Sequence, residues 1–235
     1  MTHATQAKFD VLDVFDTSHE LAPHAGEPVR TAGAPLDNAA LAVLLLHGRG
    51  AGPEDVLSLA DAYGLPGVCY VAPAAANSTW YPQAFSAGDK MNGAHVESAH
   101  TVIESVFSTL ARHGFAPERC AMGGFSQGAC LTLTHAMAYP RRYGLLFAYT
   151  GALIGNFKKG FAPHGTLDGT PVEISGGDQD AHVPWYQMKF AGEVLEGMGA
   201  EVSLDQHPGL PHTICRDQIA RTRERLQSLM ASKTP

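Results

Sequence analysis

The stretch that decides the fold is Arg119-Cys-Ala-Met-Gly-Gly-Phe-Ser-Gln-Gly128, which joins a predicted strand directly to a predicted helix. So short a turn pushes one side chain out of the sheet and forces its backbone into a strained conformation. Residues two positions away on either side must then lack a Cβ, and Gly124 and Gly128 meet that requirement. We interpret Ser126 as a nucleophile at the rim of a sheet. The alternative is a glycine-rich turn with a capping serine.

The segments around this turn alternate between strand and helix patterns. Leu41-Ala-Val-Leu-Leu-Leu46 is a continuous apolar run, typical of a strand buried on both faces of a parallel sheet. We expect further strands at 67–71, 119–123, 145–149, 171–175 and 201–206, and helices at 53–63, 94–113, 127–138, 185–198 and 216–230. This alternation predicts an α/β fold with a mostly parallel sheet flanked by helices on both faces.

The first 40 residues are the least regular part of the chain. Apolar residues over 9–15 indicate a first strand, and the proline-rich segment 16–40 is expected to be a loop or a short edge hairpin. The 235 residues suit one large domain. We therefore expect an N-terminal strand and irregular segment over 1–40, and the core of the same domain over 41–235.

Composition and charge exclude several classes of partner. Sixteen Lys and Arg against 23 Asp and Glu give a net charge of -7, which argues against nucleic acid or an anionic membrane. No apolar run approaches the ~20 residues of a membrane span, and residues 1–10 carry no signal-peptide pattern. The four cysteines form no CxxC pair and the twelve histidines show no metal-ligand spacing. We expect reduced thiols, no metal and a cytoplasmic location. The charged fraction of 17% leaves room for a homodimer face.

A serine nucleophile needs a base to take its proton and an acid to orient that base. With a nucleophile on this kind of turn, the acid and then the histidine follow it in the chain. Two loops after predicted strands carry candidates, namely Asp178 and Asp180 in the first and His207 and His212 in the second. His182, on the acid's own loop, is a third candidate base. The residue pattern alone leaves both choices open.

A tetrahedral intermediate also needs two N–H donors for its oxyanion. The backbone N–H of Gln127, directly after the nucleophile, is one candidate. The other is the backbone N–H of Arg49 in His47-Gly-Arg-Gly50, which follows an early strand. An H-G-x-G pattern also fits a phosphate-binding loop. However, the chain contains neither a GKS/T nor a G-x-G-x-x-G motif.

Together these motifs resemble the phospholipase/carboxylesterase family of the α/β-hydrolase fold, which includes small bacterial carboxylesterases and acyl-protein thioesterases. The resemblance covers roughly residues 41–229 and rests on the segments 46–50, 73–80, 124–128, 177–184 and 209–212. It implies that Asp180 is the acid, that His212 is the base, and that Arg49 and Gln127 are the oxyanion donors. It also implies that Trp80 lies near the substrate.

The resemblance implies a cofactor-free serine hydrolase that cleaves small-molecule carboxylic esters of short or medium acyl chain, or thioesters, through an acyl-enzyme. Trp80, Tyr81 and Phe125 are the candidates to line the acyl side of the site. The alternatives are a lactone or C–C bond hydrolase on the same fold, a peptidase or acyltransferase, and a non-catalytic binding protein with a hydrolase fold.

Arg49 departs from the family pattern, which often has leucine at this position. Its side chain is expected either to pair with Glu54 or Asp55, or to attract a carboxylate or phenolate of the substrate. The two interpretations differ in whether the guanidinium is available to a ligand.

Overall fold

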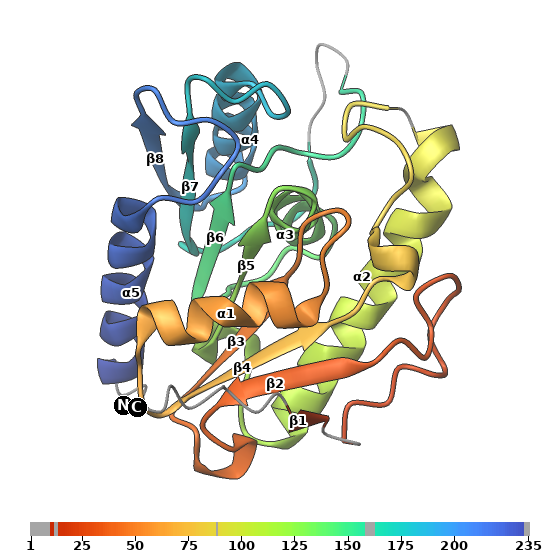
Figure 1. The fold of residues 1–235 in the computed structure, drawn as a ribbon, viewed down its shortest axis with the longest axis vertical. Coiled ribbons are helices and arrows are strands. Elements are labelled where there is room, and N and C mark those ends of the chain that lie inside the picture. The colour runs from red at the N-terminus through yellow and green to blue at the C-terminus, as the bar shows by residue number, and fades with distance from the viewer. Residues whose placement is uncertain (1–9, 12–13, 88, 158–162, 233–235) are drawn as a thin grey trace, which may run out of the picture.

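The computed structural model describes residues 10–11, 14–87, 89–157 and 163–232. These residues form one eight-stranded sheet with the order β1-β2-β4-β3-β5-β6-β7-β8 (Figure 1). The strands are β1 (Asp10–Val11), β2 (Val29–Gly33), β3 (Leu41–Leu46), β4 (Val68–Pro73), β5 (Cys120–Phe125), β6 (Leu145–Tyr149), β7 (Pro171–Gly177) and β8 (Glu201–His207). β4, β3, β5, β6, β7 and β8 pair in parallel, whereas β2 is antiparallel to both its neighbours. The expected mostly parallel sheet is confirmed.

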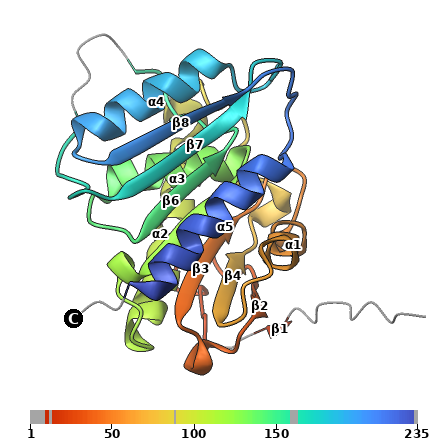
Figure 2. The same cartoon turned by 90° about the vertical axis from the view of Figure 1, so that its left-hand side faces the viewer.

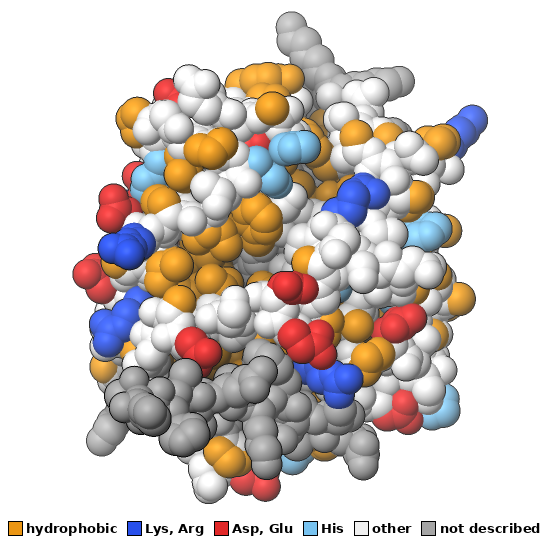
Figure 3. Space-filling view, viewed as in Figure 1, with side chains coloured by type: hydrophobic (Ala, Val, Ile, Leu, Met, Phe, Trp, Pro, Cys, Tyr) orange, Lys and Arg blue, Asp and Glu red, His pale blue; other side chains and the backbone are white. Residues whose placement is uncertain are grey.

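Helices cover both faces of the sheet, with α1 and α5 on one face and α2, α3 and α4 on the other (Figures 1 and 2). The helices are α1 (Pro53–Tyr63), α2 (Asp89–Arg112), α3 (Gln127–Ala138), α4 (Trp185–Gly197) and α5 (Arg216–Ala231). In the described ranges, none of them combines the length and the hydropathy that a bilayer crossing requires. On the face of α1 and α5, apolar side chains gather in a central area with charged side chains mainly around it (Figure 3).

The sequence of the central strand β3 is apolar at every position because both faces of this strand are covered by helices. Leu41, Val43 and Leu45 pack into the cluster under α1 and α5. The intervening residues 42, 44 and 46 pack into the cluster under α2, α3 and α4. All six side chains are buried, and each buried leucine or valine stabilises the fold by roughly 1.5–3 kcal/mol. The strand that leads into the candidate oxyanion loop is therefore held from both sides.

The N-terminal part contains a strand that the sequence pattern predicts only as a loop or a short edge hairpin. β2 pairs with β1 on one side and with β4 on the other, with Arg30 opposite Ala72. Its last residue, Gly33, has a φ of +85°, and a Cβ there would lie 2.3 Å from the Val68 carbonyl oxygen. Of the expected first strand over 9–15, only Asp10–Val11 form a strand, β1. Val14 and Phe15 are not in a strand, and residues 9 and 12–13 lie outside the described ranges.

Helix α2 begins at Asp89, earlier than the expected start near residue 94. Its first turns are polar, so the apolar spacing that predicts the helix starts only later in the sequence. Asn92 in this part ties the preceding loop to the helix. Its Oδ1 accepts the Gln83 N–H at 3.0 Å, and its Nδ2 donates to the Ala84 carbonyl at 2.9 Å. The loop that follows β4 is thus fixed at its far end.

Candidate active site

Ser126 occupies a strained turn between β5 and α3. Its backbone has a φ of 55° and a ψ of -115°, a conformation that costs about 1–3 kcal/mol for a residue other than glycine. A Cβ at Gly124 would lie 2.3 Å from the Leu46 carbonyl oxygen, and one at Gly128 would lie 2.0 Å from the same atom. Both glycines are required because the turn packs directly against the end of β3. The Ser126 N–H donates to the Tyr149 carbonyl at 3.0 Å, which anchors the turn to β6.

His212 lies between the serine and a buried carboxylate. Its Nε2 is 2.7 Å from Ser126 Oγ, and its Nδ1 is 2.7 Å from Asp180 Oδ2. The other carboxylate oxygen, Asp180 Oδ1, accepts the backbone N–H groups of His182 at 2.8 Å and Val183 at 2.9 Å. A carboxylate fixed in this way holds the imidazole with Nδ1 protonated, so that Nε2 is free to accept the proton of the serine hydroxyl.

The alternative acid and bases from the sequence have other contacts. Asp178 Oδ1 accepts the Gly209 N–H at 2.7 Å. His207 Nε2 lies 3.2 Å from Asp205 Oδ2. The ring of His182 packs against that of His212 with a centroid distance of 4.7 Å, while its backbone N–H contacts the acid. The structure thus brings Asp180 and His212 to Ser126, and it places the other candidates around them.

The loops that carry Asp180 and His212 are joined to each other. Strands β7 and β8 pair in register up to Gly177 and His207, where the two loops begin. Beyond that point the Gln179 N–H donates to the Leu210 carbonyl at 3.3 Å, in addition to the bond from Gly209 to Asp178. A Cβ at Gly177 would lie 1.7 Å from the Leu210 carbonyl oxygen. Glycine at 177 is therefore needed for the two loops to close on each other.

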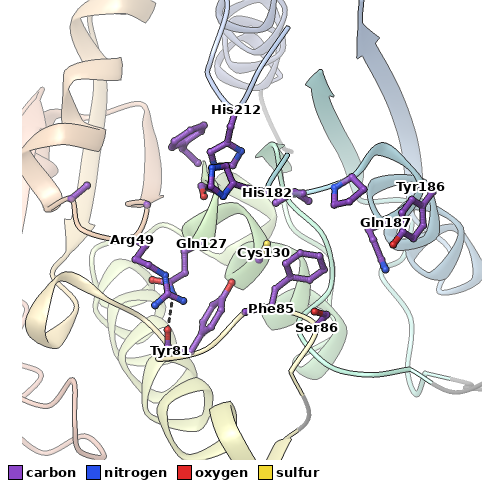
Figure 4. Close-up of a pocket in the computed structure, with 17 residues that line it drawn as sticks. Arg49, Tyr81, Phe85, Ser86, Gln127, Cys130, His182, Tyr186, Gln187 and His212 are labelled. Atoms are coloured by element: carbon purple, nitrogen blue, oxygen red, sulfur yellow. Dashed lines mark hydrogen bonds between the residues drawn. The ribbon is translucent and has the colours of Figure 1, made fainter. Parts of the chain in front are cut away.

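A cavity of about 610 Å³ opens beside Ser126, within the range of ~300–1,000 Å³ that is usual for ligand sites (Figure 4). Arg49 and Tyr81 lie on one side of it, and Tyr186 and Gln187 lie on the other. The lining residues are Gly48, Arg49, Ala51, Tyr81, Ala84, Phe85, Ser86, Phe125, Ser126, Gln127, Cys130, His182, Val183, Pro184, Tyr186, Gln187 and His212. Seven of the eight site residues expected from the sequence are either in this lining or, like Asp180, directly behind it.

Trp80 is the exception, because it does not line the cavity. Its side chain is fully buried, and its Nε1–H donates to the His47 carbonyl at 3.0 Å. The indole packs against the imidazoles of His47 and His24, at centroid distances of 5.1 Å and 5.3 Å. The tryptophan therefore packs behind the cavity, whereas Tyr81 and Phe125 line it.

Gln127 holds the Trp80 loop through its side chain, a role that the sequence does not suggest. Its Oε1 accepts the Trp80 N–H at 2.7 Å and the Thr79 hydroxyl at 3.3 Å, and its Nε2 donates to the Tyr81 carbonyl at 2.7 Å. The backbone N–H of Gln127 is the first of α3 and has no acceptor within that helix. The residue thus offers an N–H beside Ser126 while its amide clamps a cavity wall.

Two buried histidines complete the support. His47 opens the motif that carries Arg49, but the motif does not indicate this supporting role, and His24 has no distinguishing signal among twelve scattered histidines. His47 Nδ1 donates to the Gly48 carbonyl at 2.8 Å, and its Nε2 accepts the Ala75 N–H at 3.1 Å. His24 accepts the Ala76 N–H at 3.1 Å and donates to the Trp80 carbonyl at 3.1 Å. Burial lowers the pKa of both imidazoles, so they are neutral at pH 7.

The Arg49 side chain turns towards the loop after Tyr81. Its Nη1 donates to the Pro82 carbonyl at 2.9 Å, and its Nη2 donates to the Gln83 carbonyl at 2.6 Å. The expectation that it pairs with Glu54 or Asp55 is therefore wrong. The side chain follows the cavity wall instead of the first turn of α1, where those two carboxylates lie.

The class of protein follows from these features. A mostly parallel sheet with helices on both faces, a serine on a strained strand-to-helix turn, and an acid and a histidine on later loops in that order define an α/β-hydrolase. A family model described as Phospholipase/Carboxylesterase matches residues 31–230. The chain belongs to the phospholipase/carboxylesterase family.

Individual relatives agree with this family. The chain is 36% identical to a phospholipase/carboxylesterase from Dyadobacter fermentans of known structure, with a TM-score of 0.82 over 89% of this chain and 100% of that chain. It is 30% identical over 110 residues to acyl-protein thioesterase 1 of Gibberella zeae, a match that spans 45% of this chain and 46% of that protein. A protein of Oryza sativa subsp. japonica named as a probable carboxylesterase is 26% identical over 84% of this chain and 82% of its own length.

Proposed function

We propose that the protein hydrolyses small-molecule carboxylic esters or thioesters through an acyl-enzyme on Ser126. The observation that carries the proposal is the pair of 2.7 Å hydrogen bonds that join His212 to Ser126 and to Asp180. The names of the relatives, which include acyl-protein thioesterase 1 and phospholipase/carboxylesterase, support an ester or thioester bond as the one that is cleaved.

In the acylation step, His212 Nε2 takes the hydroxyl proton as Ser126 Oγ attacks the acyl carbon. Asp180 stabilises the imidazolium that forms. The oxyanion of the tetrahedral intermediate accepts the backbone N–H groups of Arg49 and Gln127, which flank the serine in the cavity. The carbon–oxygen or carbon–sulfur bond then breaks, and the imidazolium gives its proton to the leaving alcohol or thiol.

Water completes the cycle from the position that the leaving group has left. His212 takes a proton from this water as it attacks the acyl carbon, and a second oxyanion forms in the same place. Ser126 Oγ then leaves with the proton of the imidazolium, and the carboxylic acid is released. Every step uses side chains and backbone groups of this chain, together with water.

The cavity supports substrates with a short or medium acyl chain. Its volume of about 610 Å³ is shared between the acyl and leaving groups. The rings of Tyr81, Phe85 and Phe125 line it, and they are suited to contact hydrocarbon. We propose that these rings, with Val183, bind the apolar part of the substrate.

Labelling with a fluorophosphonate tests the nucleophile. Wild type should be labelled and should hydrolyse 4-nitrophenyl esters, and Ser126→Ala should do neither while unfolding at the wild-type temperature. His207→Gln is the matched control, because His207 ends β8 just before the loop of His212 and should be dispensable. A panel of acyl lengths and of acyl-CoA then defines the substrate. Wild-type turnover by a folded Ser126→Ala would reject the proposal.

A further inference from the structure

The charge of the cavity differs from that of the whole chain. The chain has a formal net charge of -7, yet no Asp or Glu is among the described residues that line the cavity. Arg49 is the lining residue with a permanent charge, and the two imidazoles of the lining can only add to it. Asp180 lies behind His212, and three N–H donors occupy its carboxylate. Within the described lining itself, the one permanent charge is therefore positive.

The Arg49 guanidinium has no carboxylate partner among the described residues. The ion pairs of those residues do not include it. Glu54 is instead 3.2 Å from Arg30 Nε, and Asp55 accepts the Gly52 N–H at 2.7 Å. The two acceptors that Arg49 does have are neutral backbone carbonyls. Its positive charge is consequently not compensated within the site.

The guanidinium is also held in place before any ligand arrives. The Pro82 and Gln83 carbonyls that it contacts belong to the loop clamped at Tyr81 by the Gln127 amide. The same loop is fixed at Gln83 by Asn92. A guanidinium has five N–H donors in a rigid plane, so two bonds to carbonyls leave donors for a further planar anion. A group fixed in this way loses little freedom on binding.

We propose that Arg49 makes the cavity selective for esters or thioesters that carry a carboxylate close to the scissile bond. The inference rests on the proposed hydrolase function and names the substrate class of that site. In the proposed mechanism the backbone N–H of Arg49 binds the oxyanion, and its side chain places a cation on the wall of the same cavity. A carboxylate on the substrate meets this cation at a wall whose described lining holds no Asp or Glu, and it accepts a charge-assisted hydrogen bond from the guanidinium.

Matched pairs of substrates test the charge preference on each side of the bond. For the acyl side, the pair is 4-nitrophenyl hydrogen adipate and the 4-nitrophenyl ester of adipamic acid. For the leaving group, it is 3-carboxyphenyl butyrate and 3-carbamoylphenyl butyrate. Wild type should favour the carboxylate member of at least one pair in kcat/KM. Arg49→Met should lower that preference by about 10- to 100-fold, the usual value of a hydrogen bond to a charged group.

Two further variants separate charge from loop support. Arg49→Lys keeps the charge without the planar fork and should give an intermediate preference. Arg30→Met removes the same charge next to Glu54, outside the cavity, and should leave the preference unchanged. If Arg49 only holds the loop, Arg49→Met slows both members of a pair equally, and that result overturns the inference.

The failure of this inference can be told apart from failure of the proposed function. Absence of fluorophosphonate labelling and of all ester hydrolysis contradicts the proposed function. Hydrolysis through Ser126 without any charge preference overturns the Arg49 inference alone. Calorimetry with adipate and adipamide needs no turnover. Adipate should bind wild type more tightly than Arg49→Met, and equal binding of adipate to the two proteins would count against the inference.

Discussion

Replacing Gln127 by alanine should destabilise the loop of Trp80 and Tyr81, which supports the cavity. The substitution removes none of the proposed catalytic groups. The backbone N–H of residue 127 and Ser126 both remain in this variant. What is lost is the amide that accepts the Trp80 N–H at 2.7 Å and donates to the Tyr81 carbonyl at 2.7 Å. The residue is 4% exposed, so water does not readily replace the amide.

The expected loss in the free energy of unfolding follows from these two hydrogen bonds. A buried polar group left without its partner costs about 1–3 kcal/mol, and two such groups are stranded in the buried loop. We expect the free energy of unfolding to fall by about 2–4 kcal/mol, since some water will reach the space that is left. For a domain of this size about 1 kcal/mol corresponds to roughly 2–4 °C, so the Tm should fall by roughly 5–15 °C.

Thermal unfolding followed by intrinsic fluorescence measures this loss, because buried Trp80 reports on the same loop. Gln127→Met keeps the volume without the hydrogen bonds and should lose nearly as much stability as Gln127→Ala. Gln187→Ala changes the other glutamine of the cavity, on the opposite wall, and should shift the Tm by less than about 2 °C. Gln127→Met that unfolds at the wild-type temperature would refute the assignment of stability to the amide.

Three further outcomes are expected. Gly128→Ala places a Cβ 2.0 Å from the Leu46 carbonyl oxygen and should abolish soluble folded protein. Gly197→Ala is the control: a Cβ there has no atom of the described residues within 4 Å, and the Tm should be unchanged or higher. Equal behaviour of the two variants would contradict the packing argument. Burial lowers the pKa of His24, His47 and His135, and that of His100 to about 3, so the folded state keeps them neutral while the unfolded chain binds protons below about pH 6.5. The urea midpoint should therefore fall as the pH is lowered from 7.5 to 5.5, and a flat profile would count against it. Burial raises the pKa of the Cys69 and Cys130 thiols to about 11 and that of Cys120 to about 12, whereas Cys215 is partly exposed. A disulfide reagent should modify one thiol rapidly in the folded protein and none in Cys215→Ser, and a second fast thiol would show that the core opens.

Much of the fold is predictable because burial on both faces leaves a clear pattern. β3 reads as six apolar residues in a row, and the glycines around Ser126 have no simpler explanation than a tight turn. β2 is less visible, since it is short and ends in Gly33, and proline precedes and follows it. Its place between β1 and β4 depends on long-range pairing, which local sequence does not encode.

Some features of the candidate site can likewise be predicted from the sequence, and others cannot. The order of nucleophile, acid and histidine along the chain is readable, but the choice between Asp178 and Asp180 is not, because both follow the same strand. It depends on which carboxylate points to His212, and that is set by contacts between loops. The direction of the Arg49 side chain and the burial of Trp80 likewise depend on the loop after β4, whose path has no periodic signal.

The joined loops after β7 and β8 have a consequence for how the site responds to heat. The acid and the histidine lie on two loops that are joined by hydrogen bonds and strand pairing at Asp178, Gln179 and Gly177. We therefore expect the two loops to move together. The serine lies on the turn directly after β5, and β6 separates that strand from β7 and β8. Small twisting motions of the sheet would then change the distance between the His212 imidazole and the Ser126 hydroxyl. They would leave the distance between His212 and the Asp180 carboxylate unchanged. Warming below the unfolding temperature should therefore lower the activity. The Ser126 hydroxyl would move away from His212, while the hydrogen bond between His212 and Asp180 stays intact.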